Sequence, residues 1–305
     1  MYNKILVPLD GSPLSESVLP AAAKFASAFS IPMELFHVVE SGLESLMSAA
    51  AKKQPGTVEE NLITNGNAYL QRAAEAIPSS LSVSYKVKRG NAADLIIDEA
   101  AEDKATLVAM ASRGLTGAKR WLLGSVADKV LQAGKNPLLL VRQSDGEAPG
   151  GQWTPRQLLV PLDGSVLAET ALPHAMAIAK PLNLKIELMR AYNLPIGVAA
   201  PAPYAGSVNA DKIAQEALRE EVEKYLREKV SQTASEGIKD VSHVVALGEA
   251  GQQIVDTAAQ GPRTLIVMCT HGRTGVGRWI LGSVAARVAH HASCPVLVVR
   301  GASPS

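Results

Sequence analysis

The chain carries one sequence written twice, and this duplication constrains its fold more than any other feature. Residues 4–20 read KILVPLDGSPLSESVLP and residues 157–173 read QLLVPLDGSVLAETALP, so residue 4 matches residue 157. Further along, RWLLGSVADKV at 120–130 matches RWILGSVAARV at 278–288. A repeat of this length indicates a duplicated domain rather than a solenoid unit. Matching residues are 153 positions apart in the first pair of stretches and 158 apart in the second. The difference predicts about five extra residues in the middle of the second copy.

Length and linker composition place the boundary between the copies. The 305 residues suit two domains of about 150 residues each. Between the copies, residues 143–156 read QSDGEAPGGQWTPR, which is rich in Gly, Pro and polar residues and is typical of a linker. We therefore expect one domain over residues 1–145 and a second over residues 154–305.

Each copy alternates short apolar runs with stretches of helical periodicity. In the first copy we expect strands at 4–9, 33–40, 82–88, 106–111 and 137–142, and helices at 15–29, 58–76, 91–103 and 124–134. Strands that are apolar throughout and alternate with helices indicate a parallel sheet covered on both faces. Because crossovers in such sheets are right-handed, the fold class predicted for each copy is a doubly wound α/β domain.

Two loops in each copy lie where such sheets bind ligands, beyond the carboxyl ends of the strands. The first is PLDGS, which carries Asp10 or Asp163. The second follows the fourth strand, is rich in Gly, and ends at a helix start with Gly-Ser. A helix N-terminus offers free N–H groups, Gly permits close approach, and Ser adds a hydroxyl. With Arg113, Lys119, Arg120, Arg273 and Arg278 nearby, these loops suggest a polyphosphate cradle.

Simpler interpretations of the same residues remain open at this stage. Gly-Ser before a helix often serves only as a cap, and Asp after a strand often only forms a turn. Neither loop has the spacing of a Walker A motif or of a dinucleotide fingerprint. His37 is interpreted as a packed residue rather than a base, and Trp121 and Trp279 as packing anchors. No metal site is expected, because the two cysteines lack ligand spacing.

The combination of these fragments resembles the universal stress protein family. The similar features are a first strand ending in VPLDGS, HVVE after the second strand, SRG or THG before GSVA, and the terminal NPLLLVR and CPVLVVR. The resemblance covers essentially the whole chain, once per half, so the chain looks like a tandem member. It implies a Rossmann-like, five-stranded parallel sheet of order 3-2-1-4-5 in each domain, and a role in the stress response.

The resemblance also implies a set of nucleotide contacts. Nucleotide-binding members carry Gly-x-x-Gly, nine residues, and then Gly-Ser or Gly-Thr. Here the first Gly is replaced in both halves, by Ala111 and Cys269. In the second half, Arg190-Ala191 stands where the first has His37-Val38. The implied nucleotide-binding residues are Pro8, Leu9, Asp10, Val38, Ala111, Arg113, Gly114, Gly117, Gly124, Ser125 and Val126, with Pro161, Leu162, Asp163, Ala191, Cys269, His271, Gly272, Gly275, Gly282, Ser283 and Val284 in the second half.

These residues imply a regulatory or sensor protein that binds ATP in each domain, with or without Mg²⁺. We expect no catalytic residues and at most slow hydrolysis, since the loop holds no positioned general base. The alternatives are a nucleotide-free interaction scaffold, which Ala111 and Cys269 favour, and an adenine-nucleotide hydrolase. If one half fails to bind, we expect it to be the second, given Arg190-Ala191.

The net charge and the expected edge strands predict which partners the protein binds. The net charge of +1 and the absence of long apolar runs or a signal-peptide pattern predict a cytoplasmic protein that binds neither nucleic acid nor membrane. Each copy ends in an apolar strand that would lie exposed at a sheet edge. We therefore expect strand 137–142 to pair antiparallel with strand 295–300, making the chain an intramolecular pseudo-dimer. A further homo-oligomer is left open.

Overall fold

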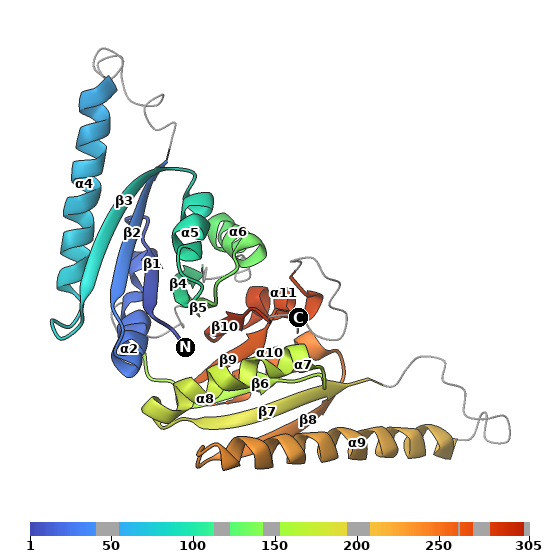
Figure 1. Cartoon of the computed structure of the whole chain (residues 1–305). Helices are drawn as coiled ribbons and strands as arrows, with labels where there is room; N and C mark the ends of the chain where they lie inside the picture. Colours follow the sequence, from blue (N-terminus) through green and yellow to red (C-terminus); the bar gives the residue numbers. More distant parts are fainter. Residues whose placement is uncertain are drawn as a thin grey trace. The chain divides into compact units, whose positions relative to one another are not determined.

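The computed structural model describes residues 1–40, 55–112, 123–142, 153–193, 208–261, 263–270 and 281–301, which form two compact units (Figure 1). Unit 1 contains the described residues up to Thr154 together with Leu281 and Pro295–Arg300. Unit 2 contains the other described residues from Pro155 onward. No helix in these described ranges is both long and apolar enough to cross a membrane.

Unit 1 is a doubly wound α/β domain. Its elements are β1 (Lys4–Pro8), α1 (Pro13–Glu16), α2 (Leu19–Phe29), β2 (Met33–Glu40), α4 (Pro55–Glu75), β3 (Val83–Gly90), α5 (Ala92–Ala101), β4 (Thr106–Ser112), α6 (Ser125–Ala133), β5 (Leu138–Arg142) and β10 (Val296–Val299). The strands lie in the order β3-β2-β1-β4-β5-β10. Helices α2 and α4 cover one face of the sheet, and α5 and α6 cover the other (Figure 1).

The central strands of unit 1 form because their side chains are apolar on both faces. Ile5, Leu6 and Val7 of β1 have no exposed surface, which suits a central parallel strand covered by helices on both sides. The pairs Ile5↔Met33 and Val108↔Leu138 fix the parallel registers with β2 and between β4 and β5. The core therefore lies between the central strands and the two helix layers.

The last strand of unit 1 comes from the end of the chain. β10 pairs antiparallel with β5, with Val296 opposite Leu140 and Val298 opposite Leu138. Arg300, directly after β10, donates a hydrogen bond of 2.5 Å to the carbonyl of Leu131 in α6. The predicted antiparallel pairing of strands 137–142 and 295–300 is thus confirmed, and it covers the apolar edge that β5 would otherwise expose.

Unit 2 repeats the same plan. Its elements are β6 (Gln157–Pro161), α7 (Val166–Glu169), α8 (Ala171–Leu182), β7 (Lys185–Tyr192), α9 (Val208–Ser235), β8 (Val241–Leu247), α10 (Ala250–Gln260), β9 (Thr264–Cys269) and α11 (Ser283–His291). The strands are parallel in the order β9-β6-β7-β8. The predicted fold class is confirmed, and the strand order is consistent with 3-2-1-4-5 in each copy.

Two features of the elements refine the expectations. The single helix predicted at 15–29 is wrong, because the structure breaks it into α1 and α2. Pro20 lies in the first turn of α2 and has no N–H to donate to the carbonyl of Glu16, so one continuous helix is disfavoured there. The matching Pro173 is the third residue of α8, again within the first turn. The second copy's longer middle falls at α9, which spans 28 residues where α4 spans 21.

Candidate functional site

A cavity of about 680 Å³ opens in unit 1 beyond the carboxyl ends of β1, β2 and β4. Residues of helix α4 and of the first turn of α6 also line it. Eight of the residues implied by the sequence line this cavity together: Pro8, Leu9, Asp10, Val38, Ala111, Gly124, Ser125 and Val126. The place agrees with the general rule that open α/β sheets bind ligands where the strand order reverses, here between β1 and β4.

Asp10 is held in a tight turn at the edge of the cavity. Its Oδ1 accepts hydrogen bonds from the Ser12 amide at 2.9 Å and from the Ser12 hydroxyl at 2.6 Å. The Ser12 oxygen in turn accepts from the Ser15 amide and caps α1. Partial burial acts to raise the pKa of Asp10, but the hydrogen bonds from Ser12 and Ser15 outweigh it, so the pKa lies below its usual value. The lining of the cavity therefore includes an ionised carboxylate.

The cavity is also lined by an open helix N-terminus. Gly124 is the N-cap of α6, with φ −63° and ψ 147°, and no side chain caps the helix there. A Cβ placed on Gly124 would meet no heavy atom within 4 Å in the described part of the chain. Because the first-turn amides of a helix lack partners within the helix, the N–H groups after Gly124 face space that an anion can fill.

His37 and Tyr69 bring further polar atoms to the wall of the cavity. His37 Nδ1 lies 2.8 Å from the carbonyl oxygen of Leu9. Since a carbonyl only accepts, Nδ1 carries the proton, and in the neutral ring Nε2 is left as an acceptor. The Tyr69 ring meets His37 edge-on, at 5.6 Å and 65°. Burial, followed by the nearby Glu16 carboxylate, raises the pKa of Tyr69 to about 12, so this hydroxyl keeps its proton.

Sequence reasoning missed part of this wall. It interpreted His37 as a packed residue, whereas the ring lines the cavity, and it did not name Tyr69 at all. Tyr69 lies three residues after Gly66 on α4, so both residues fall on the same helix face. A small residue and an aromatic at that spacing were the available signal. Which face of α4 meets the sheet is decided by packing and could not be taken from periodicity alone.

Unit 2 repeats the turn and the helix cap. Asp163 Oδ1 accepts from the Ser165 amide at 2.9 Å and from its hydroxyl at 2.6 Å. Gly282 caps α11 with φ −64° and ψ 147°, again without a capping side chain. The remaining described residues implied by the sequence occupy matching places: Pro161 ends β6, Leu162 follows it, Ala191 lies in β7, Cys269 ends β9, and Ser283 and Val284 begin α11.

Several implied residues cannot be placed. Arg113, Gly114, Gly117, His271, Gly272 and Gly275 lie outside the described residues, as do the basic residues Lys119, Arg120, Arg273 and Arg278 and the tryptophans Trp121 and Trp279. Within the described ranges, no group of three or more His, Cys, Asp or Glu side chains is arranged to hold a metal ion.

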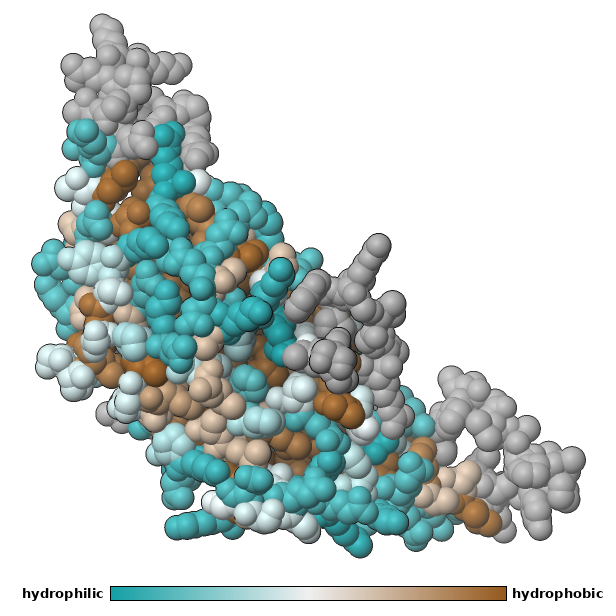
Figure 2. Space-filling view, in the orientation of Figure 1, coloured by the Kyte–Doolittle hydropathy of each residue, from teal (hydrophilic) through white to brown (hydrophobic). Residues whose placement is uncertain are grey.

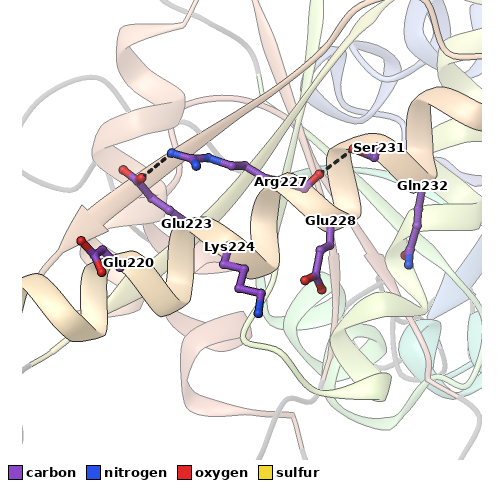
Figure 3. A pocket seen from close by; sticks show the side chains of 7 residues that line it. All are labelled: Glu220, Glu223, Lys224, Arg227, Glu228, Ser231 and Gln232. Carbon is purple, nitrogen blue, oxygen red and sulfur yellow. Dashed lines mark hydrogen bonds and ion pairs between the residues drawn. The ribbon is translucent and has the colours of Figure 1, made fainter.

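A second hollow, of about 790 Å³, follows the charged face of α9 (Figure 3). All seven lining residues belong to this one helix, from Glu220 to Gln232. Arg227 bonds to the Glu223 carboxylate at 2.9 Å, which is an ordinary contact one helical turn apart. The surface of this helix is mostly hydrophilic in the space-filling view (Figure 2). Because the described residues that line this hollow all come from one helix, the unit 1 cavity, which several elements line, is the better candidate site.

Comparisons with known proteins agree with the fold and the duplication. The family model described as "Universal stress protein family" matches residues 1–142 and again residues 155–300. A universal stress protein of Mycolicibacterium smegmatis is 27% identical over 304 residues, covering 97% of this chain and 96% of its own. One from Methanocaldococcus jannaschii is 35% identical over 146 residues, covering 48% of this chain and 82% of its own.

Solved structures show the same architecture. The crystal structure of a universal stress protein from Archaeoglobus fulgidus has a TM-score of 0.64 at 21% identity, covering 98% of this chain and 99% of that one. A structure from Pseudomonas aeruginosa has the same TM-score at 17% identity, covering 98% and 94%. With two family matches that together span nearly all of its length, this chain belongs to the universal stress protein family.

Proposed function

We propose that the protein is a regulatory protein that binds an adenine nucleotide, ATP, in the cavity of unit 1. One observation carries this proposal: one cavity is lined both by the ionised carboxylate of Asp10 and by the uncapped N-terminus of α6. A nucleoside polyphosphate has hydroxyls that donate to a carboxylate and phosphates that accept from amides, so it can use both features.

Each part of the nucleotide has a matching surface. The phosphates would accept from the N–H groups that begin α6, next to the Ser125 hydroxyl. The ribose hydroxyls would donate to Asp10. The base would lie against the neutral wall near Val38, within reach of the His37 and Tyr69 polar atoms. The described residues offer no dedicated metal cage, so we assign no protein ligand to a Mg²⁺ ion that accompanies ATP.

The acid–base groups of the cavity favour binding over catalysis. The Asp10 carboxylate accepts two hydrogen bonds from Ser12, and His37 Nδ1 donates to a backbone carbonyl. The Tyr69 hydroxyl holds its proton, as its raised pKa indicates. A general base needs an accessible lone pair aimed at the attacking group. The lone pair that His37 Nε2 keeps lies in the wall where we place the base of the nucleotide, not among the residues that would hold the phosphates. We therefore propose at most slow hydrolysis and a role in which the bound nucleotide sets the state of the protein.

The second copy keeps two of the features on which this proposal rests. Asp163 and Gly282 repeat the carboxylate turn and the open helix cap, so the expectation of a second ATP rests on them. The contrary candidate, a nucleotide-free scaffold, is favoured by one observation. The side chain of Ala111 lines the unit 1 cavity at a position where nucleotide-binding relatives carry Gly.

A thermal-shift experiment separates the candidates. Ligand that binds only the native state stabilises it by about 2.7 kcal/mol at a hundredfold excess over Kd. We expect Mg·ATP to raise the melting temperature by several degrees, and AMP to raise it less because it lacks the outer phosphates. Equal shifts from ATP and from inorganic triphosphate would remove the base from the proposal. No shift with any of the three at millimolar concentration would favour the scaffold.

A further inference from the structure

The two copies match residue by residue around the turn after the first strand. The Asp10–Ser12 and Asp163–Ser165 hydrogen bonds have the same lengths, 2.9 and 2.6 Å. The match extends to the long helices α4 and α9. Tyr69 lies beside His37 of β2 and precedes a fully buried leucine, and Tyr225 lies beside Arg190 of β7 and precedes another. Tyr225 therefore occupies the place of Tyr69.

In unit 1 this part of the site is open. The buried Tyr69 hydroxyl lies near the Glu16 carboxylate, which raises its pKa, but it makes no hydrogen bond of good geometry within the described residues, and Tyr69 belongs to the cavity wall. Gly66 lets the helix approach the histidine, because a Cβ on Gly66 would lie 3.1 Å from His37 Cδ2. Here a glycine, an imidazole and a phenol line the cavity, with no cation from α4 beside them in the described residues.

In unit 2 the corresponding residues are engaged with one another. The Arg190 guanidinium lies 5.0 Å from the centroid of the Tyr225 ring. The Tyr225 hydroxyl donates to Glu169 Oε1 at 2.8 Å, and Lys229 Nζ lies 2.7 Å from Glu169 Oε2. Lys229 Nζ is also 5.7 Å from the same ring centroid. We call these four side chains the charged cluster.

The charged cluster is largely withdrawn from solvent. Arg190 is 8% exposed, and the side chains of Lys229 and Glu169 are 17% and 25% exposed. By the same alignment, Val222 takes the place of Gly66 and Lys229 the place of Ala73. The second copy thus has a branched residue and a cation at the two positions where the first copy has the small residues Gly66 and Ala73.

We propose that the charged cluster, with Val222, excludes the adenine base from unit 2, so that the chain holds one nucleotide, in unit 1. The reason is the cost of disturbing paired charges. A purine that enters would separate Arg190 or Lys229 from its partners away from water, and an uncompensated buried charge is strongly unfavourable. In unit 1 the same space is bounded by Gly66, the His37 imidazole and the Tyr69 phenol, whose polar atoms can bond to the base edge. This inference rests on the proposed nucleotide binding in unit 1.

Counting bound nucleotide tests it first. In equilibrium dialysis with Mg·ATP, we expect about one nucleotide per wild-type chain, none for Gly124→Asp, and no change for Gly282→Asp. Two nucleotides per wild-type chain, or one retained in Gly124→Asp, would leave nucleotide binding intact and overturn the exclusion. No binding by the wild type would instead contradict the proposed function.

Exchanging the residues tests the cause. In the Gly124→Asp background, the triple change Arg190→His, Val222→Gly and Lys229→Ala should restore about one nucleotide per chain, held by unit 2. A folded variant that still binds none would overturn the assignment.

The reverse exchange is a second test, and its result does not depend on whether the triple variant of unit 2 folds. His37→Arg, Gly66→Val and Ala73→Lys rebuild the charged cluster around Glu16 in unit 1. We expect ATP binding to fall below detection while inorganic triphosphate binding changes little, because the phosphate end is untouched. Unchanged ATP affinity would contradict the inference.

Discussion

At the scale of single residues, the site depends on which charges the backbone turns hold in place. Asp10 points at the cavity because Ser12 fixes its Oδ1 and caps α1 with the same hydroxyl. Gly124 is needed for space rather than for a special backbone conformation, since its φ of −63° suits any residue. The two residues therefore admit substitutions that alter ligand binding and leave the fold in place.

Asp10→Asn should weaken ATP binding and keep the turn. The amide oxygen can still accept from Ser12, but the ribose loses a charged acceptor, which costs about 1–2 kcal/mol or roughly tenfold in affinity. Because the pKa of Asp10 lies below its usual value, wild-type affinity should not change through this group between pH 5 and 8. Calorimetric titration over that range checks both statements. Asp163→Asn is the matched control in unit 2, and an equal loss from it would contradict the assignment to unit 1.

At the scale of elements, helix α5 pins the edge strand β3 through one buried carboxylate. Glu99 has a side chain 1% exposed, and its two oxygens lie 2.7 Å from Lys86 Nζ and from Lys88 Nζ. Burial acts to raise the pKa of Glu99, but the hydrogen bonds and charges of the two lysines outweigh it, and the pKa is lowered. Lys86 and Lys88 also oppose pairing of the edge strand β3 with a strand of another chain.

This arrangement predicts an acid-sensitive contribution to stability. The lowered pKa means that Glu99 stabilises the fold above its unfolded pKa, about 4.3, and that this is lost as pH falls through the folded value. Glu99→Gln should reduce the free energy of unfolding at pH 7 by roughly 1–3 kcal/mol, and the gap to wild type should close below about pH 4. Denaturant unfolding at both pH values measures it. Glu102→Gln, whose side chain is 57% exposed and 4.0 Å from Lys86, should change little. An equal effect from both would refute the role of Glu99.

The helices and strands also show how much of the structure can be predicted from the sequence. Apolar strands such as β1 and the helix at α4 follow from periodicity, and the Asp10 and Gly124 loops follow from their places after strands. The break before Pro20 was available in principle from the missing N–H. The contacts of Tyr69 and of the charged cluster were not, because they depend on how each long helix is rotated against its sheet.

At the scale of the whole molecule, the duplication is tied to the edge of unit 1. The last strand of the second copy, β10, pairs with β5 of the first, and Leu139, Leu140, Leu297 and Val298 are fully buried or nearly so. A chain that ends before the second copy would lose this cover and expose an apolar strand edge.

A chain truncated after residue 148 should therefore associate. We expect it to sediment as a dimer or larger species at micromolar concentration, because the exposed edge of β5 would pair with a strand of another molecule. Replacing Leu139 and Val141 by Lys in the truncated chain should suppress that association, since charges on an edge strand oppose pairing. A truncated chain that stays monomeric and soluble at high concentration would show that β5 does not need β10.

The central claim is that the first turn of α6 receives the phosphates of ATP, and Gly124→Asp tests it most directly. Asp is among the best N-cap residues, so this variant should melt at or above the temperature of the wild type. The same carboxylate would fill the anion space and repel phosphate. In equilibrium dialysis with Mg·ATP, we expect unit 1 binding to fall at least roughly a hundredfold, with Gly124→Ala losing less because it adds only a methyl group. A well-folded Gly124→Asp chain that binds ATP as tightly as the wild type would contradict the account.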